Sequence, residues 1–122
     1  VKKHYFVDNG LLNIFLANPD NALLENACAV ALHRRYGAGL RFYRHHVEVD
    51  FYVPCAGLAV QACWSMSEAD TARREIRALE KLDAHVPLTR RIIVTREQRD
   101  IVRLANGRTI EVLPLAEWLL ET

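Results

Sequence analysis

Glu48-Val-Asp-Phe-Tyr-Val53 and Leu58-Ala-Val-Gln-Ala-Cys-Trp64 are the two segments that decide the fold of this chain. Both have the composition of a β-strand, and the connection Cys55-Ala-Gly57 predicts a short turn between them. Side chains alternate along a strand, so the residues of the first segment divide into two expected sets. These are Val47, Val49, Phe51 and Val53 on one side, and Glu48, Asp50 and Tyr52 on the other.

The second segment divides in the same way. Leu58, Val60, Ala62 and Trp64 share one expected face, and Ala59, Gln61 and Cys63 share the other. An aspartate in mid-strand beside Gln61 and Cys63 is an unusual group to place next to a core. The pattern therefore indicates a functional site, or what remains of one.

The composition places limits on the class of protein. The chain has 122 residues, which suits one domain over 1–122, and 51% hydrophobic residues, which suffice for a core. It has no run of eighteen apolar residues and no signal peptide, so we expect a cytoplasmic protein that does not enter a membrane. The net charge of +1 neither demands nor excludes a nucleic-acid partner. Cys28, Cys55 and Cys63 are odd in number and predict reduced thiols.

Hydrophobic periodicity predicts the remaining elements. The expected strands cover 4–8, 40–46, 91–95, 101–104 and 109–113, and the expected helices cover 11–16, 20–36, 67–82 and the residues from Pro114 onward. Ser67 and Asp70 predict a reciprocal cap for the third helix, and Asn106-Gly107 predicts a hairpin. A helix between strands 58–64 and 91–95 implies a parallel crossover. The fold class is therefore α/β, with a mixed sheet flanked by helices.

Three side chains could meet around one divalent cation. Glu25 on the first long helix, Asp50, and Gln61 supply oxygen ligands of the kind that Mg²⁺ or Mn²⁺ prefers. Two structural alternatives stay open. Glu25 would also be favoured simply by lying near a helix N-terminus, and Asp50 would support the fold alone if it paired with Arg44 or His46.

Two further groups have alternative interpretations. Arg73, Arg74, Arg77 and Lys81 lie off the apolar stripe of their helix, where they form a solvated face or contact phosphate. Cys63 is either a buried thiol or a nucleophile assisted by His45 or His46.

Several short stretches occur in an order and spacing that resemble a known family. They are His4-Tyr-Phe-Val-Asp-Asn-Gly-Leu-Leu-Asn13, Leu23-Leu-Glu-Asn26, Phe42-Tyr-Arg44, Glu48-Val-Asp-Phe51, Val60-Gln-Ala-Cys63 and Val112-Leu-Pro-Leu115. Together they resemble the C-terminal domain that follows an AAA-type ATPase module in many bacterial and archaeal proteins. Such domains look like the restriction-endonuclease fold, whose signature is an acidic residue, then Asp, then Glu-x-Lys. The chain begins without methionine, so we expect a C-terminal fragment of such an ATPase.

The resemblance implies roles for particular residues. The helix carboxylate corresponds to Glu25, the signature aspartate to Asp50, and Glu-x-Lys to Gln61-Ala62-Cys63. This chain departs from the pattern twice, because Gln61 is neutral and a thiol at Cys63 cannot supply the charge of an ammonium group. No lysine obviously replaces it, although Lys81 lies on the following helix.

Two functions follow as expectations. The first is an accessory or interaction domain with a degenerate nuclease core, docking on the ATPase module, on another copy of itself, or on nucleic acid. The second is a weak metal-dependent nuclease that uses Asp50, Gln61 and Cys63 at the degenerate catalytic positions, with Arg73, Arg74 and Arg77 on the nucleic acid. The chain has no Gly-x-x-x-x-Gly-Lys-Ser/Thr sequence, so an ATP site would belong to another part of the polypeptide.

Overall fold

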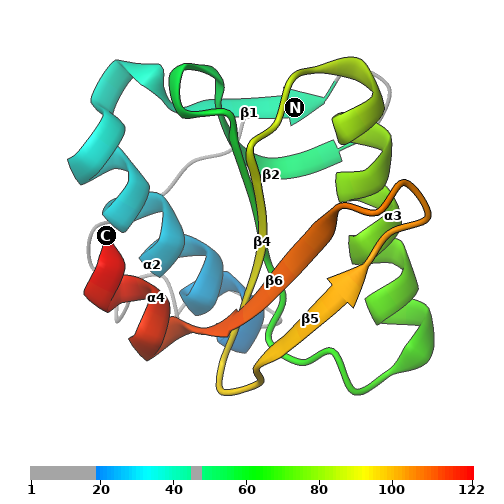
Figure 1. Cartoon of the computed structure of the whole chain (residues 1–122). Helices are drawn as coiled ribbons and strands as arrows, with labels where there is room; N and C mark the ends of the chain where they lie inside the picture. The colour runs from blue at the N-terminus through cyan, green and yellow to red at the C-terminus, as the bar shows by residue number, and fades with distance from the viewer. Residues whose placement is uncertain (1–18, 45–47) are drawn as a thin grey trace.

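A six-stranded mixed sheet with helices on both faces forms the domain (Figure 1). The computed structural model describes residues 19–44 and 48–122. Its helices are α2 (Pro19–Tyr36), α3 (Ala69–His85) and α4 (Leu115–Glu121), with short 3₁₀ turns at Gly37–Gly39 and Pro54–Ala56. Its strands are β1 (Arg41–Arg44), β2 (Glu48–Val53), β3 (Leu58–Ala62), β4 (Arg90–Thr95), β5 (Asp100–Arg103) and β6 (Thr109–Pro114). The α/β class is confirmed, and the elements expected at 4–8 and 11–16 lie outside the described residues.

The strand order in the sheet is β1-β2-β3-β4-β6-β5. The first three strands are antiparallel, and α3 carries the chain from β3 to β4, which runs parallel to β3. The expected parallel crossover is therefore confirmed. The Asn106-Gly107 hairpin is also confirmed, because it joins β5 to β6 with Gly107 at a φ of 84°. In the described residues, no helix has the length and apolar character needed to span a bilayer.

The core consists of two layers separated by the sheet. On one face, α2 and α4 cover the sheet with Leu24, Cys28, Leu32 and Trp118. On the other face, α3 contributes Leu79 and Leu82. All residues of β3 are buried, since both of its faces are covered. Each large apolar side chain buried in this way contributes about 1.5–3 kcal/mol before the cost of ordering the chain.

The alternation in β2 differs from the sequence expectation. Phe51 and Val53 do face α2 as a pair, but Val49 packs on the α3 face together with Tyr52. The register explains this, because Arg41 pairs with Tyr52 while Tyr43 pairs with Val49. An extra residue on β2 makes a bulge, which reverses the side that each later residue faces. The prediction of one face for Val49, Phe51 and Val53 was therefore wrong, and Val47 lies outside the described residues.

The start of α3 also differs. The helix begins at Ala69, and its N-cap residue Glu68 makes no side-chain capping bond. The Ser67 hydroxyl instead accepts hydrogen bonds from Ser65 and from the side-chain amide of Gln98. Gln98 also accepts a bond from the Met66 N–H at 2.6 Å. The predicted cap was wrong because contacts to the loop after β4 hold this turn.

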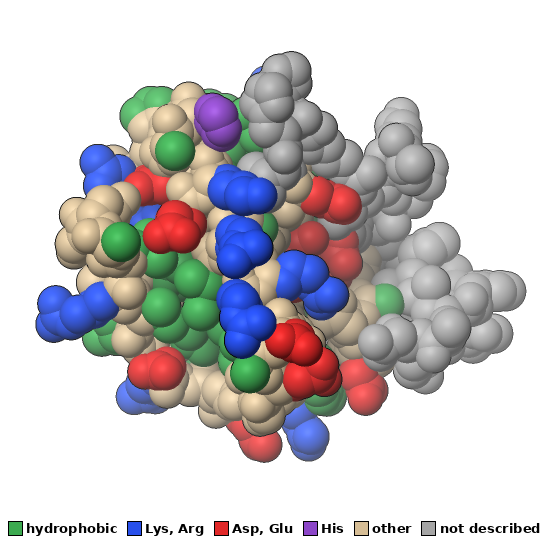
Figure 2. All heavy atoms as spheres, turned by 90° about the vertical axis from the view of Figure 1, so that its right-hand side faces the viewer, with side chains coloured by type: hydrophobic (Ala, Val, Ile, Leu, Met, Phe, Trp, Pro, Cys, Tyr) green, Lys and Arg blue, Asp and Glu red, His purple; other side chains and the backbone are tan. Residues whose placement is uncertain are grey.

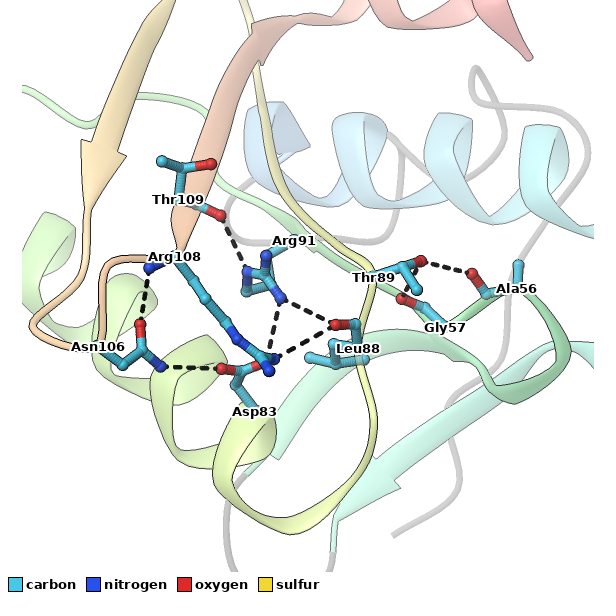
Figure 3. A network of polar contacts seen from close by, with 9 residues as sticks. All are labelled: Ala56, Gly57, Asp83, Leu88, Thr89, Arg91, Asn106, Arg108 and Thr109. Atoms are coloured by element: carbon cyan, nitrogen blue, oxygen red, sulfur yellow. Dashed lines mark hydrogen bonds and ion pairs between the residues drawn. The ribbon is translucent and has the colours of Figure 1, made fainter.

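A buried ion pair fastens the end of α3 to β4 (Figure 3). The Asp83 side chain is 3% exposed and lies 3.1 Å from the Arg91 guanidinium, which is 8% exposed. Arg91 also donates to the carbonyls of Thr109 and Leu88, and Arg108 and Asn106 donate to Asp83. These additional bonds matter because a buried ion pair with unsatisfied atoms costs more than it contributes.

Gly57 makes the β2–β3 turn possible. Its φ of 59° lies in the left-handed region, and its carbonyl accepts the Thr89 N–H at 2.7 Å. The Thr89 hydroxyl donates to the carbonyls of Ala56 and Gly57 (Figure 3). A Cβ at position 57 would lie 3.1 Å from the Thr89 backbone nitrogen. The turn therefore needs glycine for conformation and for space.

We expect Gly57→Ala to lower the free energy of unfolding by more than the cost of the left-handed conformation alone, which is about 1–2 kcal/mol. Gly37→Ala is the matched control, because Gly37 also has a positive φ, 54°, but has open space around its Cβ position. Urea unfolding of both variants gives the comparison. Equal losses would show that the contact with Thr89 has no energetic weight.

Candidate functional site

Asp50 and Gln61 join the ends of β2 and β3 through their side chains. The regular pairing of these strands ends at Phe51 and Val60. Beyond it, the Asp50 N–H donates to Gln61 Oε1 at 2.7 Å, and the Ala62 N–H donates to Asp50 Oδ2 at 2.9 Å. Each side chain thus replaces a backbone acceptor. A hydrogen bond to a carboxylate contributes about 1.5–3 kcal/mol, so this pair stabilises the sheet where the ladder stops.

This arrangement restricts what the two groups can do chemically. Gln61 is 3% exposed, and its oxygen already accepts a backbone hydrogen bond. One oxygen of Asp50 is engaged in the same way. A cation bound here would have to share these oxygens with the backbone or break the bonds between the strands.

Glu25 lies on α2, near the same buried thiol as Asp50. Burial, and then the charges of Asp50 and Glu25, raise the pKa of the Cys28 thiol. Both carboxylates therefore lie within electrostatic range of Cys28. Among residues 19–44 and 48–122, no three His, Cys, Asp or Glu side chains form a group that could hold a metal ion. Because the expected ligand set contains only two carboxylates and an amide, the Mg²⁺ or Mn²⁺ site stays a prediction.

Cys63 is a buried thiol that points into its own loop. Its side chain donates to the Ser65 carbonyl at 3.2 Å, and the residue is 4% exposed. Burial, followed by the nearby charge of Glu75, raises the pKa of this thiol to about 11. Cys63 is therefore protonated at neutral pH, which disfavours the nucleophile hypothesis. His45 and His46, its suggested partners, lie outside the described residues, as does the side chain of Arg44.

The positive side chains of α3 border a hollow that contains Asp50 and Gln61. The hollow has a volume of about 460 Å³ and is lined from the strands by Glu48, Asp50 and Gln61. From α3 it is lined by Asp70, Arg73, Arg74, Glu75, Arg77, Ala78 and Lys81. Figure 2 shows Lys and Arg side chains in a column on this face, with acidic side chains beside them.

The four cations differ in their surroundings. Arg73 pairs with Asp70 at 3.0 Å in an exposed position, and the exposed Arg74 lies 3.8 Å from Glu75, whose side chain is 16% exposed. Such surface pairs contribute about 0–1 kcal/mol, so they leave the arginines available to other anions. Within the described residues, Arg77 and Lys81 have no carboxylate at ion-pair distance.

Sequence reasoning missed part of this site. It identified Asp50, Gln61 and the three arginines, and it placed Glu48 on the strand face of Asp50, but it did not expect Glu75 in the same hollow. It also left open the reach of Lys81, which lines the hollow together with Asp50. The four-residue spacing of Arg73, Arg77 and Lys81 was the available signal, because it places them along one ridge of a helix.

Comparisons with protein-family models, with curated proteins and with solved structures gave no match for this chain.

We expect thiol reagents to distinguish the three cysteines. Cys55 is exposed, whereas Cys28 and Cys63 are buried and disfavour the thiolate form that reacts. Iodoacetamide at mildly alkaline pH should modify Cys55 in the folded protein, and the other two only after unfolding. Peptide mass mapping gives the sites, with Cys55→Ser as the control. Modification of Cys63 at the rate of Cys55 would contradict the burial of its thiol.

Proposed function

We propose that this chain is an accessory domain of an ATPase that binds nucleic acid through α3 and has lost the ability to cleave it. The α/β class, with a mixed sheet between helices, is compatible with the nuclease-like core that the resemblance implies. The resemblance to domains that follow an ATPase module supports the assignment of an accessory role.

One observation carries the proposal: the positive side chains of α3 line the same hollow as Asp50 and Gln61, which are two of the degenerate catalytic positions. Arg73, Arg77 and Lys81 recur every four residues, so they follow one another along the helix at intervals of about 6 Å. A row of positive charge of this kind suits a phosphate backbone, because phosphate contacts need charge and position but no base recognition. Glu48 and Glu75 on the same hollow would limit how closely a strand approaches its floor.

The loss of cleavage follows from the groups at the centre. Cys63 is a neutral thiol bonded to the Ser65 carbonyl, so it supplies no positive charge near Asp50. Gln61 contributes no charge to hold a cation, and its oxygen is engaged by the backbone of Asp50. Metal-dependent hydrolysis needs carboxylates to hold the ion and open positions for substrate and water.

A second function has one observation in its favour. Lys81 lines the same hollow as Asp50, so it is a candidate for the missing cationic role. A weak Mg²⁺- or Mn²⁺-dependent nuclease would then use Glu25, Asp50 and Gln61 as ligands and Lys81 in place of a lysine at position 63.

Binding to DNA should depend on salt through the α3 cations. We expect Arg77→Ala and Lys81→Ala each to weaken binding and to reduce the slope of log Kd against log salt by about one. Arg34→Ala is the matched control, because it removes an exposed arginine from α2 on the opposite face of the sheet. Fluorescence anisotropy over a salt series measures both quantities. Absent or salt-independent binding would refute the nucleic-acid proposal.

Plasmid nicking separates the two functions. With Mg²⁺ or Mn²⁺, we expect the wild type and Asp50→Ala to leave supercoiled plasmid intact, because neither has a cation at the position of Cys63. If the wild type nicks the plasmid and Asp50→Ala does not, the domain is a nuclease and the proposal of a non-cleaving domain is wrong. Lys81→Ala would then show whether Lys81 takes part.

A further inference from the structure

The hollow between α3 and the strands β2 and β3 has two walls of different charge. The strand wall, formed by Glu48, Asp50 and Gln61, carries two carboxylates and, among the described lining residues, no cation. The α3 wall carries four cations and two carboxylates. A ligand that fits both walls therefore has one anionic side and one side that donates hydrogen bonds.

The uncompensated positive charge of the α3 wall lies at Arg77 and Lys81. Arg73 and Arg74 each lie beside a carboxylate of their own helix, at 3.0 and 3.8 Å. Arg77 and Lys81 are exposed, and in the described part of the chain neither has a carboxylate at ion-pair distance. They are four residues apart, so about 6 Å of helix separates them. The anionic side of a ligand would therefore meet two positive charges in a row.

The strand wall can accept hydrogen bonds from a ligand. Glu48 is exposed at the start of β2, and Asp50 is half-buried. A carboxylate has about four lone-pair sites, so both side chains can accept further bonds beside those that they already make. Their negative charge repels a phosphate and attracts an amino group. The strand wall therefore suits the part of a ligand that carries amino groups.

These two walls match the two sides of a single nucleic-acid strand. Such a strand has phosphates along one side, and its unpaired bases can turn their hydrogen-bonding edges to a protein. In a duplex the bases are paired and phosphates border both sides of each groove, so a duplex seated over the hollow would bring phosphates toward Glu48. The hollow has a volume of about 460 Å³, within the range of about 300–1,000 Å³ of pockets that hold small organic groups.

The lining also distinguishes among bases. No aromatic side chain lines the hollow among residues 19–44 and 48–122, so bases are not held by the stacking that makes many single-strand binders tolerant of sequence. Hydrogen bonds to the carboxylates are what the strand wall offers instead. Cytosine presents its N4 amino group to Asp or Glu, whereas thymine has a carbonyl oxygen at the corresponding position. The strand wall therefore favours cytosine over thymine.

We propose that the hollow binds single-stranded nucleic acid and prefers cytosine, with Glu48 as the residue that recognises the base. Arg77 and Lys81 contact phosphates, and the Glu48 carboxylate accepts a hydrogen bond from the cytosine amino group. Glu48 thus lowers the affinity for the phosphate backbone and provides the preference for one base. The inference rests on the nucleic-acid binding proposed above, and it adds which kind of strand and which base the site selects.

The test compares labelled oligo(dC), oligo(dT) and a mixed-sequence duplex of the same length by fluorescence anisotropy at low salt. We expect oligo(dC) to bind at least about fivefold more tightly than oligo(dT), the equivalent of one hydrogen bond. The duplex should bind more weakly than oligo(dC). The mononucleotide dCMP should compete only weakly with oligo(dC), because it has one phosphate for two cations.

Glu48→Ala and Glu80→Ala form a matched pair of variants. Each removes an exposed carboxylate that shares a hollow with Arg77, but Glu80 does not line the hollow that contains Asp50. Glu80→Ala should raise the affinity for oligo(dC) and oligo(dT) by the same factor and leave their ratio unchanged. Glu48→Ala should raise the affinity for oligo(dT) and bring the ratio close to one. Circular dichroism checks that both variants fold.

The possible failures are distinguishable. Equal affinity of the wild type for oligo(dC) and oligo(dT), or an unchanged ratio in Glu48→Ala, would show that the base is not recognised by Glu48. Binding of the duplex as tight as that of oligo(dC) would contradict the preference for a single strand and leave nucleic-acid binding intact. Competition by dCMP at the concentration of oligo(dC) would assign the hollow to a free nucleotide. Absence of binding to every oligonucleotide would refute the nucleic-acid proposal itself, and this inference with it.

Discussion

Two hydrogen bonds, from the Asp50 N–H to Gln61 Oε1 and from the Ala62 N–H to Asp50 Oδ2, are the constraint on which the rest of this structure depends. A bulge in β2 interrupts its pairing with β1, close to the point where the regular pairing of β2 with β3 ends. Two backbone N–H groups there need acceptors, because a buried donor without a partner costs about 1–3 kcal/mol. The carboxylate of Asp50 and the amide of Gln61 provide them. The two side chains that the sequence suggested as functional groups, Asp50 and Gln61, thus hold β2 and β3 together.

The consequences extend to both faces of the sheet. On the α3 side, the joined strand ends form one wall of the hollow whose other wall is the cation ridge. On the α2 side, the charge of Asp50 reaches Cys28 in the core. The thiol of Cys63, at the position to which the resemblance would assign a lysine, donates to the carbonyl of Ser65 instead. The domain therefore offers a charged surface beside a centre that is used for structure.

Much of the fold could be predicted from the sequence, because its elements have strong local signals. The period of apolar residues located α2, β3 and β4, and Asn106-Gly107 located the hairpin. Alternation along β3 also predicted correctly that Gln61 and Cys63 face the same side. These inferences use neighbours in the sequence alone.

The errors have a different origin, since they depend on partners far along the chain. The bulge that turns Val49 to the α3 face arises from pairing with β1. The start of α3 is set by Gln98, which follows it by a whole helix and a strand. The burial of Arg91 depends on Asp83 and on carbonyls of other segments. The hydrogen bonds of Asp50 and Gln61 were missed for the same reason.

The stability of Asp50→Ala without metal tests the structural role of Asp50 most directly. Urea unfolding in the presence of a chelator should show a loss of about 1–3 kcal/mol relative to the wild type, since the Ala62 N–H loses its acceptor. Asp70→Ala, which removes an exposed carboxylate paired with Arg73, should change stability far less. A carboxylate kept for a metal would instead be neutral or unfavourable in the empty site. Unchanged or increased stability of Asp50→Ala would therefore contradict the account.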